Sequence, residues 1–285
     1  ADARWLRAVL DPVLRGEADL VAPSYARRRL EGVLVTGLAY PLLRAVFGQR
    51  LRQPLGREVV LSRRLAEDLA RDDAWRFDPA HAGTQLWVVT TALARDGRLA
   101  QVFLGPRPAP QAQPADVADA LARVLGTIFH AMDLHAARWQ RIRASRDVLT
   151  FGDEGALEEP GAAPASGPMV AAFELGWQDL RALWAVILPP RTLHALQRVA
   201  GAPPAGFRMA DVLWARIVYD FAVAWRVKTM DRGQLLHSLA PLYLGWVASF
   251  VNEVTPLDGA ATEARVEALC AAFEDRIRYH VCFGS

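Results

Sequence analysis

The segment LWVVTTALARDGRLAQVFLG, residues 86–105, contains the change of pattern that decides the fold class. Its first part, from Leu86 to Arg95, is apolar with helical character, and Gly97 is a typical helix terminator. Its second part, from Leu99 to Leu104, has the length and the apolar composition of a strand. A helix followed directly by a strand predicts an α/β arrangement.

The sequence before this segment shows the same alternation of helix and strand. A helix near the start has the apolar residues Trp5, Leu6, Val9 and Leu10, and a short strand is predicted from Asp19 to Pro23. Further helices are predicted at about 32–47 and at 62–71, where Ser62 has the side chain of an N-cap.

The sequence after residue 105 leaves the sheet and becomes helical. Proline cannot donate to a ladder, so the strand region is expected to end at the run Pro106, Pro108, Pro110 and Pro114. A long helix is predicted from about Ala115 to Ser145. Residues 150–168, TFGDEGALEEPGAAPASGP, are rich in glycine, proline, alanine and acid, which predicts a flexible linker.

The last part of the chain has helical patterns and no convincing strand. The predicted helices are Met169 to Ile187, Arg191 to Val199, Met209 to Val227, Gly233 to Val254 and Thr262 to Tyr279. The expected organisation is therefore an α/β region at 1–149, a linker at 150–168 and a helical extension at 169–285.

Composition excludes several classes of protein. Of the 285 residues, 52% are hydrophobic, which is ample for a large core, and 33 Lys+Arg against 31 Asp+Glu give a net charge of +2. The basic residues do not form a stripe, so nucleic acid is not an expected partner. No apolar stretch is long enough to span a bilayer. With only Cys270 and Cys282, and no signal-peptide pattern at the start, reduced thiols in a cytoplasm are expected.

Local motifs for chemistry are weak. The sequence contains no P-loop, no G-x-G-x-x-G and no G-x-S-x-G. His130, Asp133 and His135 have spacing that can resemble a metal-ligand set, but partly exposed helix histidines are the default interpretation, and no metal ligand is assigned. Asp231 is expected to cap a helix. The tryptophans of the last part, Trp177, Trp184, Trp214, Trp225 and Trp246, are expected in the core.

The segment RLRQPLGREVVLS, residues 50–62, has the pattern of a binding loop that continues into a strand and a helix. Pro54 and Gly56 indicate a sharp turn. Arg57 and Glu58 follow the turn, and Arg57 stands where a phosphate or sugar loop would want a bare backbone. Arg57 could pair with a phosphate, close the pocket by pairing with an acid, or point to solvent.

Four stretches of the first half resemble the later part of a GT-A glycosyltransferase catalytic domain, near the glucosylglycerate and mannosylglycerate synthases. They are GEADLVAPSYARR (16–28), GLAYPLLRAVFGQRLRQPLG (37–56), LWVVTTALARDGRLAQVFLG (86–105) and ARVLGTIF (122–129). The stretch VYDFAVAWRVKTMDRGQLLHSLAPLYLGWVASFVNE (218–253) resembles the helical extension of the same enzymes.

The resemblance implies a nucleotide-sugar-binding α/β sandwich that transfers a hexose to a small acid such as glycerate. A divalent metal, Mg²⁺ or Mn²⁺, would neutralise the leaving diphosphate. Catalytic roles would fall to Glu58 and Gln85. The sugar and acceptor would contact Tyr25, Arg27, Arg52, Gln53, Arg57 and Trp87.

This sequence departs from the family pattern at several of these positions. The family's Asp-x-Asp is absent and is expected upstream of Ala1. Arg57 replaces a small residue, although Glu58 keeps the acid. Gln85 replaces an acid and cannot ionise, and Ala109 occupies the position of the metal-binding histidine.

Two hypotheses follow. The chain is part of a nucleotide-sugar-dependent glycosyltransferase, or it is a catalytically inactive relative that acts as a binding or scaffold subunit. A partial sandwich would expose a sheet edge, so self-association or a partner chain that supplies the missing half is expected.

Overall fold

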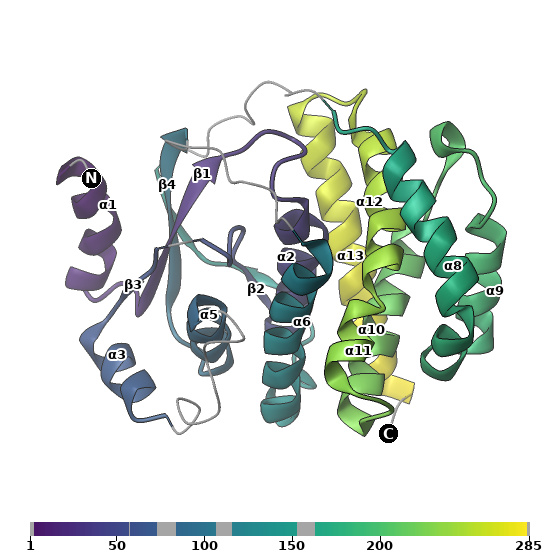
Figure 1. Ribbon diagram of the computed structural model, residues 1–285. Coiled ribbons are helices and arrows are strands. Elements are labelled where there is room, and N and C mark those ends of the chain that lie inside the picture. Colours follow the sequence, from purple (N-terminus) through teal and green to yellow (C-terminus); the bar gives the residue numbers. More distant parts are fainter. Residues whose placement is uncertain (1–2, 57, 73–83, 107–115, 153–162, 284–285) are drawn as a thin grey trace. The chain divides into compact units, whose positions relative to one another are not determined.

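The structure of the protein is a computed structural model that describes residues 3–56, 58–72, 84–106, 116–152 and 163–283 (Figure 1). The chain divides into two compact units. The first comprises Ala1–Ala112 and Gly126–Glu159, and the second comprises Gln113–Leu125 and Pro160–Ser285. The division after Glu159 falls within the predicted linker at 150–168, and the first part of helix α6 (Val117–Leu134) groups with the second unit.

The first unit contains a mixed sheet of four strands in the order β3-β1-β4-β6. These strands are β1 (Leu20–Ala26), β3 (Val60–Leu61), β4 (Leu99–Pro106) and β6 (Leu149–Phe151). Strand β4 runs parallel to both β1 and β6, whereas β3 is antiparallel to β1 (Figure 1). A second, parallel pair is formed by β2 (Gln49–Arg50) and β5 (Arg146–Asp147).

The helices of this unit precede or separate the strands in sequence, which confirms the predicted α/β class. They are α1 (Ala3–Leu14), the π-helix η1 (Val35–Ala39), α2 (Tyr40–Phe47), α3 (Arg63–Ala70), α5 (Thr84–Ala94), the later part of α6, and α7 (Ala136–Trp139). Helix α1 packs on the sheet through Val9, which is buried together with Val21, Ala100 and Val102.

Two helix boundaries follow the predicted chemistry. The Ser62 hydroxyl accepts a hydrogen bond from the N–H of Leu65 at 3.2 Å, so Ser62 caps α3. After α5, the left-handed backbone falls on Asp96, with φ of 57°, and Gly97 donates its N–H to the Ala92 carbonyl at 3.1 Å. The helix therefore ends at the predicted place, with the left-handed residue one position earlier than Gly97.

Some elements differ from the sequence predictions. The helix predicted from Ala115 to Ser145 ends at Leu134, and β5 begins at Arg146. Thr150 and Phe151, which belong to the predicted linker, form part of β6 because they pair with Gln101 and Val102. Strand β4 includes Pro106, which pairs with Ala26 at the end of β1. The remaining prolines of the run at 108–114 lie outside the described residues.

The described part of the second unit after residue 162 is helical. It contains α8 (Gly167–Ile187), α9 (Pro190–Val199), the 3₁₀ turn η3 (Pro204–Gly206), α10 (Asp211–Val227), α11 (Arg232–His237), α12 (Ala240–Val254) and α13 (Gly259–Phe283). The predicted capping role of Asp231 is confirmed, since its carboxylate accepts the N–H of Gln234 at 2.9 Å.

Aromatic side chains form the core of the helical unit. Trp184, Trp214 and Trp246 are fully buried, and the rings of Trp214 and Trp246 stack with centroids 5.7 Å apart. Trp225 is buried as well, whereas Trp177 is only half-buried and carries the Arg181 guanidinium over its ring. The prediction that tryptophans fill the core is thus confirmed for four of the five residues, since large aromatic rings bury the most area per residue.

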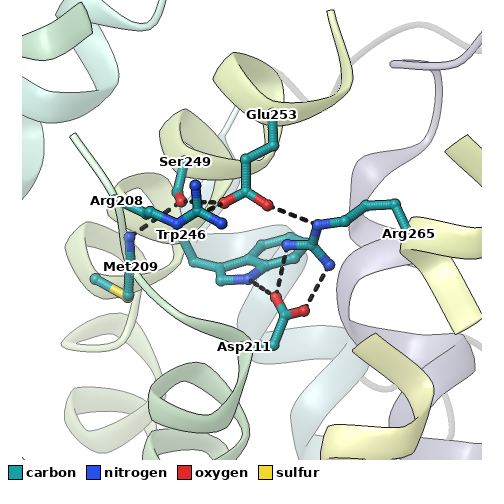
Figure 2. Close-up of polar contacts among 7 residues, drawn as sticks. All are labelled: Arg208, Met209, Asp211, Trp246, Ser249, Glu253 and Arg265. Atoms are coloured by element: carbon teal, nitrogen blue, oxygen red, sulfur yellow. Dashed lines mark hydrogen bonds and ion pairs between the residues drawn. The ribbon is translucent and has the colours of Figure 1, made fainter. Parts of the chain in front are cut away.

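A polar network joins three helices of this unit (Figure 2). The Arg265 guanidinium of α13 lies between the carboxylates of Asp211 on α10 and Glu253 on α12, with bonds of 2.8 Å and 2.7 Å. The indole N–H of Trp246 also donates to Asp211, and the Ser249 hydroxyl donates to Glu253. Each charge in the network has partners within it, so we assign it a structural role.

Candidate functional site at the carboxyl end of strand β1

The ladder between β1 and β4 is interrupted near the carboxyl end of both strands. Ser24 pairs with Phe103 and Ala26 pairs with Pro106, so the single residue Tyr25 lies opposite Leu104 and Gly105. Gly105 has φ of 77°. This is the geometry of a β-bulge, a feature that is over-represented next to functional sites.

The side chain of Gln53 completes the hydrogen bonding of the interrupted strand. The Tyr25 N–H donates to Gln53 Oε1 at 3.3 Å, and Gln53 Nε2 donates to the Tyr25 carbonyl at 2.7 Å. Gln53 is only 8% exposed. Two residues of the predicted site therefore lie together, and the loop that contains Gln53 is fixed to the carboxyl end of β1.

The loop turns at Pro54 and Leu55 and does not depend on a glycine conformation. A Cβ placed on Gly56 would meet only ordinary contacts, the nearest being the Glu58 carbonyl oxygen at 3.6 Å. The φ angle of Gly56 is also not positive. The predicted sharp turn is therefore made by the residues before Gly56, and the glycine itself is replaceable.

Arg52 is positioned through its backbone and its ring contact. Its N–H donates to Gln101 Oε1 at 3.2 Å, and its guanidinium lies 4.9 Å from the centroid of the Tyr40 ring. Gln101 is a buried residue of β4 that also donates to the Thr150 hydroxyl at 3.0 Å. Gln101 was not predicted as a site residue. Its signal in the sequence is that it is the polar residue inside the apolar strand LAQVFL.

Arg27 follows β1 directly and is buried, with 8% of its surface exposed. Its Nη1 atom lies against Gly32, where a Cβ would be 2.7 Å away. The guanidinium of Arg27 is therefore held against the segment that follows β1.

The other predicted site residues have different surroundings. Glu58 is exposed, two positions before β3. Gln85 and Trp87 are partly buried in the first part of α5, where the Trp87 carbonyl accepts the Thr90 hydroxyl at 3.0 Å. The Nε2 atom of Gln85 is buried and has no hydrogen-bond partner among the described residues. Arg57 and Ala109 lie outside the described residues.

The opposite end of β1 carries a structural ion pair. The Asp19 carboxylate accepts hydrogen bonds from the backbone and the side chain of Arg98 at 3.1 and 3.2 Å. The Arg98 guanidinium lowers the pKa of Asp19 to about 2 although burial opposes this shift. Asp19 therefore has a structural role at the start of β1.

The donor groups at the carboxyl end of β1 do not fit a divalent cation. They are the guanidinium groups of Arg27 and Arg52 and the amide of Gln53, which prefer anions or neutral partners, whereas Mg²⁺ and Mn²⁺ need several oxygen ligands. In the described ranges no three His, Cys, Asp or Glu side chains are grouped to hold a metal ion.

His135, one of the histidines with metal-ligand spacing in the sequence, is partly buried. Burial lowers the pKa of the His135 imidazole, and the Arg95 charge contributes to the same shift.

No protein-family model matches the sequence, and no curated protein matches it. None of the described helices is long and apolar enough to cross a membrane.

Proposed function

We propose that this chain is a relative of nucleotide-sugar-dependent glycosyltransferases that binds a small acid, such as glycerate, without metal-dependent hexosyl transfer. The interrupted β1–β4 ladder at Tyr25, clamped by Gln53 beside Arg52, is the observation that carries the proposal. It rests also on the sequence resemblance, in which Tyr25, Arg27, Arg52 and Gln53 correspond to the sugar and acceptor side.

The position supports a binding role. In open α/β sheets, ligands bind outside the carboxyl ends of the parallel strands. Strands β1 and β4 are such a pair, and Arg27 and the loop containing Gln53 lie at that end of β1. A β-bulge there redirects side chains, which suits recognition of a small polar ligand.

The chemistry of the donors supports an acidic ligand. A guanidinium presents two parallel N–H groups that match a carboxylate. Arg52 is partly exposed, and its contact with the Tyr40 ring restricts the guanidinium before any ligand arrives. Pre-organised donors lose less conformational entropy on binding.

Hexosyl transfer is the second candidate function, and the exposure of Glu58 favours it. Its carboxylate lies next to the binding loop, where it can accept a proton from an acceptor hydroxyl. The donor would be a UDP- or GDP-hexose, with Mg²⁺ or Mn²⁺ as the implied metal.

Calorimetry separates the two candidates. The purified chain is titrated with glycerate and then with UDP- and GDP-hexose, once in EDTA and once in Mn²⁺. The binding proposal predicts saturable glycerate binding that is equal in both buffers, and about tenfold weaker binding for Arg52→Gln. The exposed Arg63→Gln is the matched control. Hexose transfer that requires Mn²⁺ would favour the second candidate, and silent titrations in both buffers would contradict both.

A further inference from the structure

Two arginine side chains of the first unit donate to one serine hydroxyl. Arg44 Nε lies 3.2 Å from Ser145 Oγ, and Arg50 Nε lies 3.0 Å from the same atom. Arg44 is only 4% exposed, whereas the Arg50 side chain is 38% exposed. A neutral hydroxyl oxygen is thus the shared acceptor of two guanidinium groups that come from α2 and β2.

The backbone around Gly48 builds this arrangement. Gly48 ends α2 with φ of 67°, and its carbonyl accepts the N–H of Arg146, the residue after Ser145. A Cβ on Gly48 would lie 2.7 Å from Ile142 Cγ2 and 3.0 Å from the Ala144 carbonyl oxygen. The segment before β5 can therefore lie against the end of α2, and the β2–β5 pairing fixes Ser145 beside Arg44 and Arg50.

A third guanidinium is connected to the pair through Tyr40. Arg44 Nη1 donates to the Tyr40 hydroxyl at 3.2 Å, and the Arg52 guanidinium lies 4.9 Å from the Tyr40 ring centroid. Arg50 pairs with Asp147 at 3.3 Å, but that carboxylate is 81% exposed and is screened by water. A phosphate oxygen can therefore compete with Asp147 for the Arg50 guanidinium.

We propose that Arg44, Arg50 and Ser145 form a binding site for a phosphate group. A tetrahedral oxyanion accepts several N–H donors at once and is a stronger acceptor for guanidinium than a hydroxyl is. The Ser145 hydroxyl keeps its own hydrogen and can donate it to a phosphate oxygen. This site is independent of the proposed function, because it does not use Arg52, Gln53 or the Tyr25 main chain.

The test is calorimetric titration of the full chain with inorganic phosphate, at constant ionic strength, with chloride as the reference anion. The site predicts saturable phosphate binding, and Arg50→Gln and Ser145→Ala each weaken it, the arginine change by about tenfold or more. The control is Arg143→Gln, which removes the same charge two positions from Ser145, at an exposed side chain bonded to the carbonyls of Gln140 and Ile142.

Two further measurements complete the test. Glycerol 3-phosphate in place of inorganic phosphate distinguishes the phosphoryl group of a metabolite from the free ion, because tighter binding of the ester identifies a larger ligand. Circular dichroism of each variant verifies that it is folded. Absence of saturable phosphate binding in the folded wild type, or an equal loss in Arg50→Gln and Arg143→Gln, would overturn the site. Loss of glycerate binding in Arg52→Gln with phosphate binding retained in that variant would separate this site from the proposed function.

Discussion

The Gln53 side-chain amide bonds both main-chain polar groups of Tyr25, a residue 28 positions earlier in the sequence. A glutamine side chain thus provides the donor and the acceptor at the point where the β1–β4 ladder is interrupted. The shape of the carboxyl end of β1 depends on this contact.

Gln53→Ala removes both hydrogen bonds and leaves main-chain groups of Tyr25 in a partly buried place. We expect a loss of about 1–3 kcal/mol in the free energy of unfolding, because an unsatisfied buried polar group keeps its desolvation cost. Urea unfolding followed by circular dichroism measures this loss. Gln140→Ala, at an exposed position of the same unit, should change stability by less than about 0.5 kcal/mol. Equal effects of the two variants would contradict the assigned role of Gln53.

Asp19→Asn should make the free energy of unfolding less dependent on pH in the acidic range. The pKa of Asp19 is lowered to about 2 by Arg98, below its ordinary value of 3.8. Since a lowered pKa stabilises the folded state, the ion pair contributes fully above the unfolded value and is lost as pH falls towards about 2.

We expect Asp19→Asn to lose roughly 2 kcal/mol at neutral pH, an order-of-magnitude figure from the pKa difference, and the two proteins to converge as pH falls below about 4. Unfolding midpoints measured across this range supply the comparison. The matched variant is Asp11→Asn, whose partner Arg15 is 65% exposed, so the pair should contribute little at any pH. A gap between wild type and Asp19→Asn that is constant down to acid pH would refute the assignment.

Gly48→Ala should destabilise the protein by more than the cost of placing alanine in a left-handed backbone conformation. Gly48 and Gly16 have nearly the same φ, 67° and 69°, but a Cβ on Gly16 would meet nothing within 4 Å. The variant Gly16→Ala therefore measures the left-handed backbone cost alone, about 1 kcal/mol. Gly48→Ala adds a clash with Ile142 and Ala144, and we expect about 1–3 kcal/mol more. Equal losses in thermal or chemical unfolding would show that the segment before β5 does not lie against α2.

Arg265→Gln should destabilise the helical unit strongly. The change leaves Asp211 and Glu253, which are 15% and 17% exposed, without the guanidinium between them, and we expect a loss of about 3 kcal/mol. Arg278→Gln on the same helix removes a more exposed guanidinium, 42% exposed, and should cost below about 1 kcal/mol. Denaturant unfolding followed by tryptophan fluorescence reports on this unit through its buried indoles. If Arg265→Gln unfolds like wild type, the network does not join the three helices.

Local chemistry predicted much of the fold. Several features are visible in the sequence because each depends on neighbouring residues or on side-chain size. They are the Ser62 cap, the Asp231 cap, the first part of strand β1 and the tryptophan core. The strand expected at the end of the 50–62 segment is β3. Strands β2, β5 and β6 were missed, because each has two or three residues, too few for a periodic pattern, and each exists through its partner strand.

The candidate site was predictable in part. Sequence resemblance selected Tyr25, Arg52 and Gln53, but the bonds that give them a role join residues far apart in the chain. Gln53 reaches back 28 positions to Tyr25, and Gln101 bonds Arg52 across 49. Such pairings leave no local periodicity, and a bulge is set by the register of two strands.

We propose that the carboxyl end of β1 binds a small acid through Arg52 and the Gln53-clamped loop without a metal ion. The most direct measurement is a crystal structure of the chain soaked with glycerate and Mn²⁺, with anomalous scattering data to locate manganese. We predict a glycerate carboxylate at hydrogen-bond distance from the Arg52 guanidinium and no manganese peak at that edge. A manganese ion coordinated there by side chains of this protein, or an edge with no bound acid, would contradict the account.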